Sequence, residues 1–237
     1  MKASARSVIR STLRSVGYDI VSADAWRDVD IDIRRAVKKP HPAIFDVGAN
    51  VGDTVKRLRA LFPGSTVHAF EPGSQALATL RHNVGGDRNV VINDIALGDE
   101  AGARILIENK STVMSSFLEN GADSFGEIDR TRTVNVSTID AYCASAGIPF
   151  IDLVKIDVQG FDLNVLQGAS RMMADNGIGA VLLEIMFIEL YKGAAPAHEL
   201  LRKMSDGGFE IAGLYHFSYR RNRLGWMDAL FVNPKIA

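Results

Sequence analysis

The segment Ile44-Phe45-Asp46-Val47-Gly48-Ala49-Asn50-Val51-Gly52-Asp53 decides the fold of this 237-residue chain. It begins as a short apolar run and ends in a glycine-rich turn, which predicts a buried parallel strand followed by a helix. In an open parallel sheet, ligands bind at the edge where strands end and helices begin. Gly48 and Gly52 let the backbone approach a ligand without an intervening Cβ, and the next helix points its free N–H groups at that ligand. Alone, this segment predicts only that a small ligand binds at a strand–helix turn.

Strands and helices alternate along most of the remaining chain. Short spacing of this kind is typical of right-handed βαβ units, so we expect an α/β fold with a parallel sheet. Expected strands are residues 43–47, 66–70, 90–93, 153–157, 180–185, 209–214 and 226–232. Expected helices are residues 53–61, 74–83, 138–146, 163–174 and 197–206. The last two strands are expected to be joined by a basic loop, residues 219–223.

Residues about 100–136 interrupt this alternation. Residues 104–108 and 132–136 are typical of strands, and the stretch between them is rich in Ser, Asn, Gly and Asp. A loop this long in a compact domain is usually functional or mobile, so residues 109–130 are a candidate active-site lid, with a plain surface insertion as the equal alternative. We divide the chain into a helical extension, residues 1–40, and one α/β domain, residues 41–237.

Residues about 3–16 are expected to form a helix. Lys2, Arg6, Arg10 and Arg14 recur every four residues, so they would share one face. We favour an ordinary helix packed on the domain. The alternative is a basic amphipathic helix that makes peripheral contact with an anionic membrane surface or a lipid-linked substrate.

Composition excludes several classes of protein and site. The net charge of -1 provides no basic field for nucleic acid, so no nucleic-acid partner is expected. Cys143 is the only cysteine, which excludes an intrachain disulfide and a cysteine-built zinc site. No apolar run approaches the roughly 20 residues of a spanning helix, and the N-terminus lacks a secretion signal, so we expect a cytoplasmic protein. The oligomeric state stays open.

Two acids at the ends of the next strands narrow the expected ligand. Glu71 can accept hydrogen bonds from both hydroxyls of a ribose, and Pro72 ends its strand. Asp94 can accept a hydrogen bond from an adenine amino group. The alternative is a set of surface carboxylates, but their joint placement favours an adenosine pocket without a phosphate cradle. The expected cofactor-binding residues so far are Asp46, Gly48, Asn50, Gly52, Glu71 and Asp94.

An ordered set of motifs extends over roughly residues 43 to 233. They are Asp46-Val47-Gly48-Ala49-Asn50-Val51-Gly52, Phe70-Glu71-Pro72, Ala96-Leu97-Gly98-Asp99, Lys155-Ile156-Asp157-Val158-Gln159-Gly160, Val165-Leu166-Gln167-Gly168-Ala169, Leu183-Glu184, Leu190-Tyr191 and Met227-Asp228-Ala229-Leu230-Phe231. In this order they resemble the FkbM-type S-adenosylmethionine-dependent methyltransferases. The resemblance implies a Rossmann-like, seven-stranded, mostly parallel sheet of class I methyltransferases with helices on both faces.

The resemblance also implies S-adenosylmethionine as methyl donor, S-adenosylhomocysteine as product, and a hydroxyl acceptor on a sugar, glycolipid or secondary metabolite. Many relatives carry Glu-Gly where this chain has Gln159-Gly160. Gln159 is therefore a poor candidate for an essential acid or base.

Methyl transfer to a hydroxyl needs alignment and a base. Positioning contributes about 7–11 kcal/mol, and a placed base typically about 10²–10⁴-fold. Asp157 ends a strand on the same sheet edge as Gly48 and Glu71, and it is a candidate for both catalysis and cofactor contact. Glu184 lies near the end of the following strand. His216 is the preferred imidazole base, with a hydrogen-bonded surface histidine as the alternative.

Asp157 and Glu184 also permit a divalent cation that polarises the acceptor oxygen. We do not favour this metal, because no third ligand is evident. A second open point is the basic–aromatic cluster of residues 215–223, which can stack a sugar ring and pair with a phosphate, although a solvated loop is favoured.

Two other functions stay open. A nicotinamide-dependent enzyme is one alternative, but the chain lacks the G-x-G-x-x-G spacing of that class. The other is a non-catalytic module that keeps the adenosine pocket and binds a partner through residues 109–130.

Overall fold

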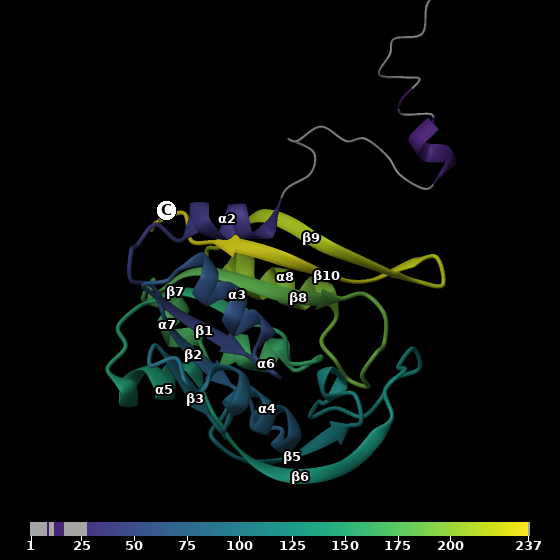
Figure 1. Cartoon of the computed structure of the whole chain (residues 1–237), viewed down its shortest axis with the longest axis horizontal. Coiled ribbons are helices and arrows are strands. Elements are labelled where there is room, and N and C mark those ends of the chain that lie inside the picture. Colours follow the sequence, from purple (N-terminus) through teal and green to yellow (C-terminus); the bar gives the residue numbers. More distant parts are fainter. Residues whose placement is uncertain (1–8, 10–11, 17–27, 237) are drawn as a thin grey trace, which may run out of the picture.

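A seven-stranded, mostly parallel sheet forms the centre of the fold (Figure 1). The computed structural model describes residues 9, 12–16 and 28–236. In spatial order, the strands are β3 (Val90–Asn93), β2 (Thr66–Phe70), β1 (Ala43–Val47), β7 (Ile151–Ile156), β8 (Ile178–Met186), β10 (Arg223–Val232) and β9 (Glu210–Arg220). Neighbours from β3 to β8 are parallel, and β10 is antiparallel to both β8 and β9. The expected seven-stranded α/β fold is confirmed.

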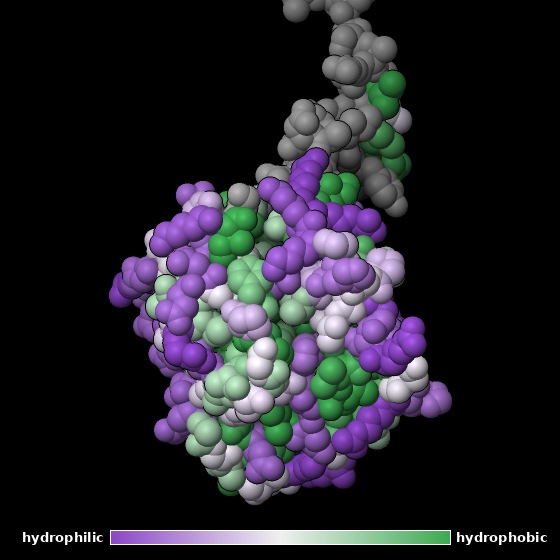
Figure 2. Space-filling model, turned by 90° about the vertical axis from the view of Figure 1, so that its left-hand side faces the viewer, coloured by the Kyte–Doolittle hydropathy of each residue, from purple (hydrophilic) through white to green (hydrophobic). Residues whose placement is uncertain are grey.

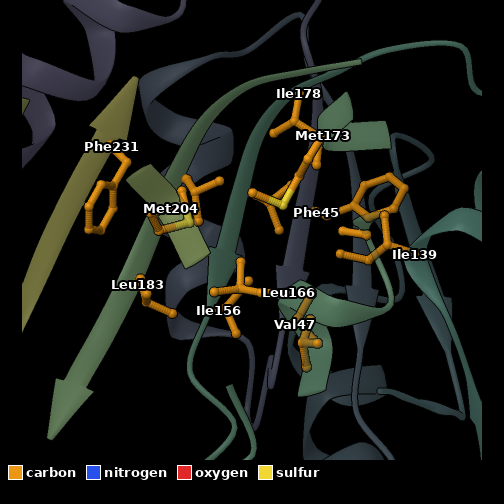
Figure 3. Packing of buried hydrophobic residues seen from close by; sticks show 14 of the residues in the cluster. Phe45, Val47, Ile139, Ile156, Leu166, Met173, Ile178, Leu183, Met204 and Phe231 are labelled. Carbon is orange, nitrogen blue, oxygen red and sulfur yellow. The ribbon is translucent and has the colours of Figure 1, made fainter. Parts of the chain in front are cut away.

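Helices cover both faces of this sheet because side chains alternate along each strand. The helices are α2 (Val29–Ala36), α3 (Asp53–Leu61), α4 (Ser74–Val84), α5 (Ile139–Ala146), α6 (Asp162–Gln167), α7 (Ser170–Ala174) and α8 (Ala197–Asp206). Phe45 and Val47 of β1 pack in one cluster with α5, α6, α7 and α8, as Figure 3 shows. Ile44, between them in sequence, packs in the opposite cluster with α2, α3 and α4. The two clusters make the fold a three-layered α/β/α domain.

A second, three-stranded sheet lies beside the first. It consists of β4 (Ala96–Leu97), β6 (Ile128–Ser137) and β5 (Gly102–Asn109), with β6 parallel to β4 and antiparallel to β5. The strands expected at residues 104–108 and 132–136 are confirmed within β5 and β6. In Figure 1, this sheet curves along the lower side of the molecule.

The segment that connects β5 to β6, residues 110–127, packs on the segment that follows β8. It contains a short 3-10 helix, η1 (Thr112–Met114). Gly121 N–H donates to the carbonyl of Leu190 (2.8 Å), and Lys192 N–H donates to the carbonyl of Glu119 (2.8 Å). Met114, Met186, Leu190 and Tyr191 form a small buried cluster between the two segments. The candidate lid is therefore attached to the end of β8.

The prediction of one continuous helix at residues 163–174 is wrong, because the structure has two helices there. α6 ends at Gln167 and α7 begins at Ser170. The carboxylate of Asp140 accepts hydrogen bonds from the N–H groups of Arg171 (2.8 Å) and Met172 (2.9 Å). A side chain from another helix thus satisfies N–H groups that a continuous helix would satisfy internally.

The last two strands are longer than expected, and the prediction of a basic loop at residues 219–223 is wrong. β9 extends to Arg220 and β10 begins at Arg223, so only Arg221 and Asn222 connect them. Both connecting residues have positive φ (46° and 61°), which is the backbone of a type I′ hairpin turn. This turn matches the twist of the two strands and lets their pairing continue to its ends.

The predicted N-terminal extension is only partly described. Ile9 and residues 12–15 are helical, whereas Lys2, Arg6 and Arg10 lie outside the described residues. α2, within the predicted extension, buries Val29 and Ile33 in the same cluster as Ile44. The division after residue 40 stays a prediction.

The described surface is mixed in polarity. Figure 2 shows, on the side of α5 and the C-terminus, hydrophilic side chains around smaller hydrophobic patches. Among the helices that the structure describes, none combines the length and apolar character needed to cross a membrane.

Candidate functional site

The turn after β1 meets the ends of β2 and β7 at one edge of the sheet. The N–H groups of Gly48 and Ala49 both donate to the carbonyl of Phe70, at 3.1 and 3.0 Å. On the other side, Asp157 N–H donates to the carbonyl of Val47 (3.1 Å). These bonds place the glycine-rich turn between Glu71, the expected ribose-binding acid, and Asp157, the candidate base.

The structure gives a different reason for the two glycines from the one expected. Gly48 and Gly52 have φ of +80° and +92°, which L-residues with a side chain rarely adopt. A Cβ on Gly48 would overlap the carbonyl oxygen of Asp157, and a Cβ on Gly52 would lie 2.8 Å from Cδ1 of Leu80. Both glycines are therefore required by the turn and by packing within the protein, independently of a ligand.

A cavity opens at this edge of the sheet. The empty space between its walls is about 670 Å³, including open solvent at the mouth, a size typical of small-molecule sites. One wall comes from the ends of β1, β2 and β7, and the opposite wall from the lid segment. Its lining residues are Val47, Gly48, Asn50, Phe70, Glu71, Pro72, Ala96, Leu97, Leu106, Thr112, Val113, Ser115, Ser116, Phe117, Asp157, Val158 and Gln159.

Glu71 is a buried carboxylate in the first wall. Its Oε2 accepts a hydrogen bond from Asn50 N–H (2.8 Å), and its Oε1 accepts one from Gly73 N–H (2.7 Å). Burial raises the pKa of Glu71 to about 7, although these two hydrogen bonds lower it in part. Each carboxylate oxygen has a further lone pair, so Glu71 can accept two more hydrogen bonds from a ligand.

Asp46 and Lys155 form a buried ion pair behind the turn. Lys155 Nζ lies 3.4 Å from Asp46 Oδ1 and 3.3 Å from Asp157 Oδ2. Burial raises the pKa of Asp46, and the charge of Lys155 offsets part of that rise. Burial alone would lower the pKa of Lys155, but the charges of Asp157 and Asp46 outweigh it and raise the pKa. Lys155 thus bridges two carboxylates and holds the side chain of Asp157 next to that of Asp46.

Asp157 is the centre of a second polar cluster. The amide Nε2 of Gln159 donates to Asp157 Oδ1 (2.6 Å) and lies 3.5 Å from Glu184 Oε2. The hydroxyl of Tyr191 donates to Gln159 Oε1 (2.7 Å). Burial, followed by the charge of Asp157, raises the pKa of Glu184 well above its usual range. Asp157 itself lines the cavity, with its side chain one-third exposed.

Five of the expected site residues do not line the cavity, namely Asp46, Gly52, Asp94, Glu184 and His216. Asp94 lies on the surface, 3.6 Å from Arg81 and 3.7 Å from Arg132. Gly52 packs on α4, and Oε2 of Glu184 lies 3.5 Å from Nε2 of Gln159, a residue that lines the cavity. The adenine-binding role of Asp94 stays a prediction.

His216 lies within β9 instead of following a strand. Its φ is +50°, at an irregular part of the pairing with β10, and its side chain is 57% exposed. Its Nδ1 lies 2.7 Å from Asp228 Oδ2. His216 does not line the cavity, so its role as general base stays a prediction that the geometry does not favour.

The expected basic–aromatic cluster differs in composition. Tyr215 is buried and donates to Asp32 Oδ2 (2.8 Å), so it does not belong to an exposed cluster. Arg220 instead stacks 4.3 Å from the ring centroid of Phe125 in the lid segment and 5.5 Å from that of Trp226. Among the described residues, no group of three or more His, Cys, Asp or Glu could hold a metal ion.

Ser116, Gln159 and Tyr191 belong to the hydrogen-bond network next to Asp157 but were not among the expected site residues. Ser116 carried no signal, because it lies in a polar loop of ordinary composition. Tyr191 was part of a motif, but only the fold shows that its hydroxyl meets Gln159.

The profile of the methyltransferase FkbM domain matches residues 46–211, which include the turn after β1, Glu71, Asp157 and Glu184. The chain belongs to the FkbM methyltransferase family. It is an S-adenosylmethionine-dependent methyltransferase, and the nicotinamide-dependent alternative is not favoured.

Two curated relatives are similar in sequence. The 2-O-methyltransferase NoeI of Sinorhizobium fredii is 28% identical over 205 residues, which cover 81% of this chain and 83% of NoeI. The 31-O-demethyl-FK506 methyltransferase FkbM of Streptomyces tacrolimicus is 31% identical over 180 residues, which cover 60% of this chain and 66% of that protein. Among solved structures, an rRNA methylase from Streptococcus thermophilus matches with a TM-score of 0.50 at 12% identity, over 86% of this chain and 93% of that one. This last similarity concerns the fold alone.

Proposed function

We propose that the chain O-methylates a hydroxyl group of a sugar, a glycolipid or a secondary metabolite. The observation that carries this proposal is one cavity lined by Glu71 on one strand end and by Asp157 on another, with the β1 turn between them. The names of both curated relatives, which refer to O-methyl positions, support oxygen as the acceptor atom.

The cavity wall fits an adenosine moiety. Glu71 is buried with a free lone pair on each oxygen, which suits the two hydroxyls of a ribose. Asn50 lines the cavity and its Oδ1 is buried without a hydrogen-bond partner, so it suits a ligand donor. We therefore assign cofactor binding to Glu71, Asn50 and Gly48, with Asp46 supporting the turn through Lys155.

Residues of the second wall would align the acceptor and take its proton. S-adenosylmethionine, when bound, supplies a methyl group on a positively charged sulfonium. Asp157 would accept the proton of the acceptor hydroxyl, since its carboxylate lines the cavity and Lys155 holds it in place. Glu184 is a weaker candidate base, because its raised pKa favours the protonated form. The lid segment would exclude water from this site.

The remaining expectations stay predictions. They are a small-molecule or glycan acceptor without nucleic acid, a cytoplasmic location, and membrane contact through the N-terminal helix. Lid behaviour of residues 109–130 is also a prediction, which their contribution to the cavity wall supports.

The test is methyl transfer from labelled S-adenosylmethionine to a panel of monosaccharides, extracted glycolipids and polyketides. We expect a labelled product whose methyl group survives mild alkali, as an ether does and an ester does not. We expect the same yield in the presence of EDTA, since no metal is proposed. Binding of S-adenosylmethionine without any product would favour the non-catalytic module, and a thermal shift with NAD(H) alone would contradict the proposed cofactor.

A further inference from the structure

Gln159 occupies an unusual backbone conformation beside the cavity. It follows β7 and has φ of +56°, a left-handed conformation that few residues with side chains adopt. The hydroxyl of Ser116, from the lid segment, donates to the carbonyl of Gln159 (2.7 Å). The carboxylate of Asp162 accepts hydrogen bonds from the N–H groups on both sides, of Val158 (3.3 Å) and Gly160 (3.0 Å). Contacts from two other elements thus hold a turn that is unfavourable by itself.

The side-chain amide of Gln159 can fit this site in only one orientation. Its Nε2 lies 2.6 Å from Oδ1 of Asp157, and a carboxylate oxygen accepts hydrogen bonds. A reversed amide would place Oε1 against this carboxylate oxygen, oxygen against oxygen. The Tyr191 hydroxyl fixes the other end by donating to Oε1, and burial raises the pKa of this phenol, so it remains a donor. The hydrogen bonds therefore run in one direction, from Tyr191 through Gln159 to Asp157.

An amide at this position does not titrate, which matters for Asp157. A carboxylic acid in its place would lie about as close to Asp157 as Nε2 does, at 2.6 Å. Two carboxyl groups at such a distance share one proton, because both cannot ionise easily. The amide satisfies Asp157 with a hydrogen bond and leaves its carboxylate able to accept a proton from a substrate.

We propose that Gln159 is a positioning residue whose amide orients the carboxylate of Asp157, so that Asp157 can receive the proton of the acceptor hydroxyl. This inference rests on the proposed O-methyl transfer. It assigns no acid or base role to Gln159 itself. It adds a specific function to Tyr191 and to Ser116, which hold the amide and the backbone of Gln159, respectively.

Other titratable groups also interact with Asp157, and they come from every neighbouring element. They are Lys155 of β7, Asp46 of β1, Asp162 of α6, Glu184 of β8 and Tyr191 after β8, with Asp228 of β10 acting on Glu184. A change at position 159 leaves all of them in place. A shift in the pH profile of a Gln159 variant is therefore attributable to the new group.

The experiment is the pH profile of kcat for wild type, Gln159→Glu and Gln159→Ala. In Gln159→Glu, the shared proton leaves only at higher pH, so the rising limb of kcat should move up by about one pH unit or more. In Gln159→Ala, the limb should stay in place while kcat falls about tenfold at every pH, because Asp157 loses its orientation. The Kd of S-adenosylmethionine, measured by calorimetry, should change less than about threefold in both variants.

Gln167→Glu is the matched control, because Gln167 is exposed on α6 and the substitution adds the same charge. It should keep the wild-type profile. Tyr191→Phe serves if the Gln159 variants do not fold: loss of one hydroxyl should lower kcat about threefold to tenfold without moving the limb. Wild-type kcat in Tyr191→Phe, or a wild-type limb in Gln159→Glu, would overturn the inference. If the wild type forms no methyl ether, the proposed function fails first, and the inference fails with it.

Discussion

The two halves of the cavity are built from different kinds of contact. In the half that we propose binds the cofactor, called the cofactor half below, the Glu71 carboxylate is held by the backbone N–H groups of Asn50 and Gly73. In the half that we propose binds the acceptor, called the acceptor half below, the Asp157 carboxylate is held by the side chains of Lys155 and Gln159.

This difference affects how each half responds to substitutions in the sequence. Backbone donors persist whatever the side chains are, so the cofactor half can stay constant while other parts of the sequence change. Side-chain donors change with every substitution, so the acceptor half can adapt to different substrates. The comparison predicts that substitutions in one half affect cofactor affinity and substitutions in the other affect turnover.

The largest effect is expected from the acceptor half. Asp157→Asn removes the proposed base while keeping its shape, so kcat should fall by about 10²–10⁴-fold. The Kd of S-adenosylmethionine should change much less. His216→Gln, by contrast, should keep kcat within about threefold, because His216 bonds to Asp228 outside the cavity.

Steady-state kinetics and calorimetry on both variants provide the measurement. A large loss in His216→Gln with a small loss in Asp157→Asn would exchange the roles of the two residues.

The next effect is expected from the cofactor half. Glu71→Ala should raise the Kd of S-adenosylmethionine about 100-fold, because hydrogen bonds to a charged group contribute about 1.5–3 kcal/mol each. Glu184→Gln, in the other half, should change that Kd less than about threefold, since Glu184 does not line the cavity.

Calorimetry checks both values, and Glu100→Ala, an exposed acid, is the control for loss of charge. Equal losses of affinity in Glu71→Ala and Glu184→Gln would break the distinction between the halves.

A smaller effect should follow from pH. Burial raises the pKa of Glu71 to about 7, and only the ionised form can accept hydrogen bonds at all its lone pairs. Protonation as the pH falls through 7 therefore weakens binding, so cofactor affinity should drop about tenfold from pH 8 to pH 6. Glu71→Gln should bind weakly with little dependence on pH in this range. An affinity that rises toward pH 6 in the wild type would contradict this assignment.

The smallest effect is expected where the lid segment meets the β9–β10 hairpin, outside both halves. Asp123 lies 3.5 Å from Arg221 and 3.4 Å from Arg223, and both arginine side chains are exposed. Surface ion pairs contribute at most about 1 kcal/mol, so Asp123→Asn should lower the free energy of unfolding by no more than that. Urea unfolding measures this change. A much larger loss would show that the hairpin holds the lid more firmly than its exposed contacts indicate.

The fold could be predicted in detail where the chain alternates regularly. The strands expected at residues 43–47, 66–70 and 90–93 and the helix at 53–61 have the predicted bounds. Errors arose where a distant contact ended or extended an element. Asp140 accepts hydrogen bonds from the start of α7, and a two-residue turn extends β9 and β10.

The candidate site divides in the same way. The β1 turn and Glu71 could be placed together because adjacent parallel strands end at one edge of the sheet. Asp94 also follows such a strand, but Arg81 and Arg132 flank it on the surface, which a strand pattern does not reveal. His216 was misplaced because the length and irregular pairing of β9 decide where its side chain points.

The sequence by itself determined the parallel sheet, the glycine-rich turn, the ribose-binding acid proposed at Glu71 and the family. Each of these features depends on residues close together in the sequence or on adjacent strands, and the local pattern of apolar and polar residues is enough to predict such features. Only the tertiary structure decided the acceptor half, where Ser116, Tyr191 and Glu184 meet the turn around Asp157 from three separate segments. Side-chain hydrogen bonds depend on distances of a few tenths of an ångström between remote elements, and packing of the whole domain sets those distances.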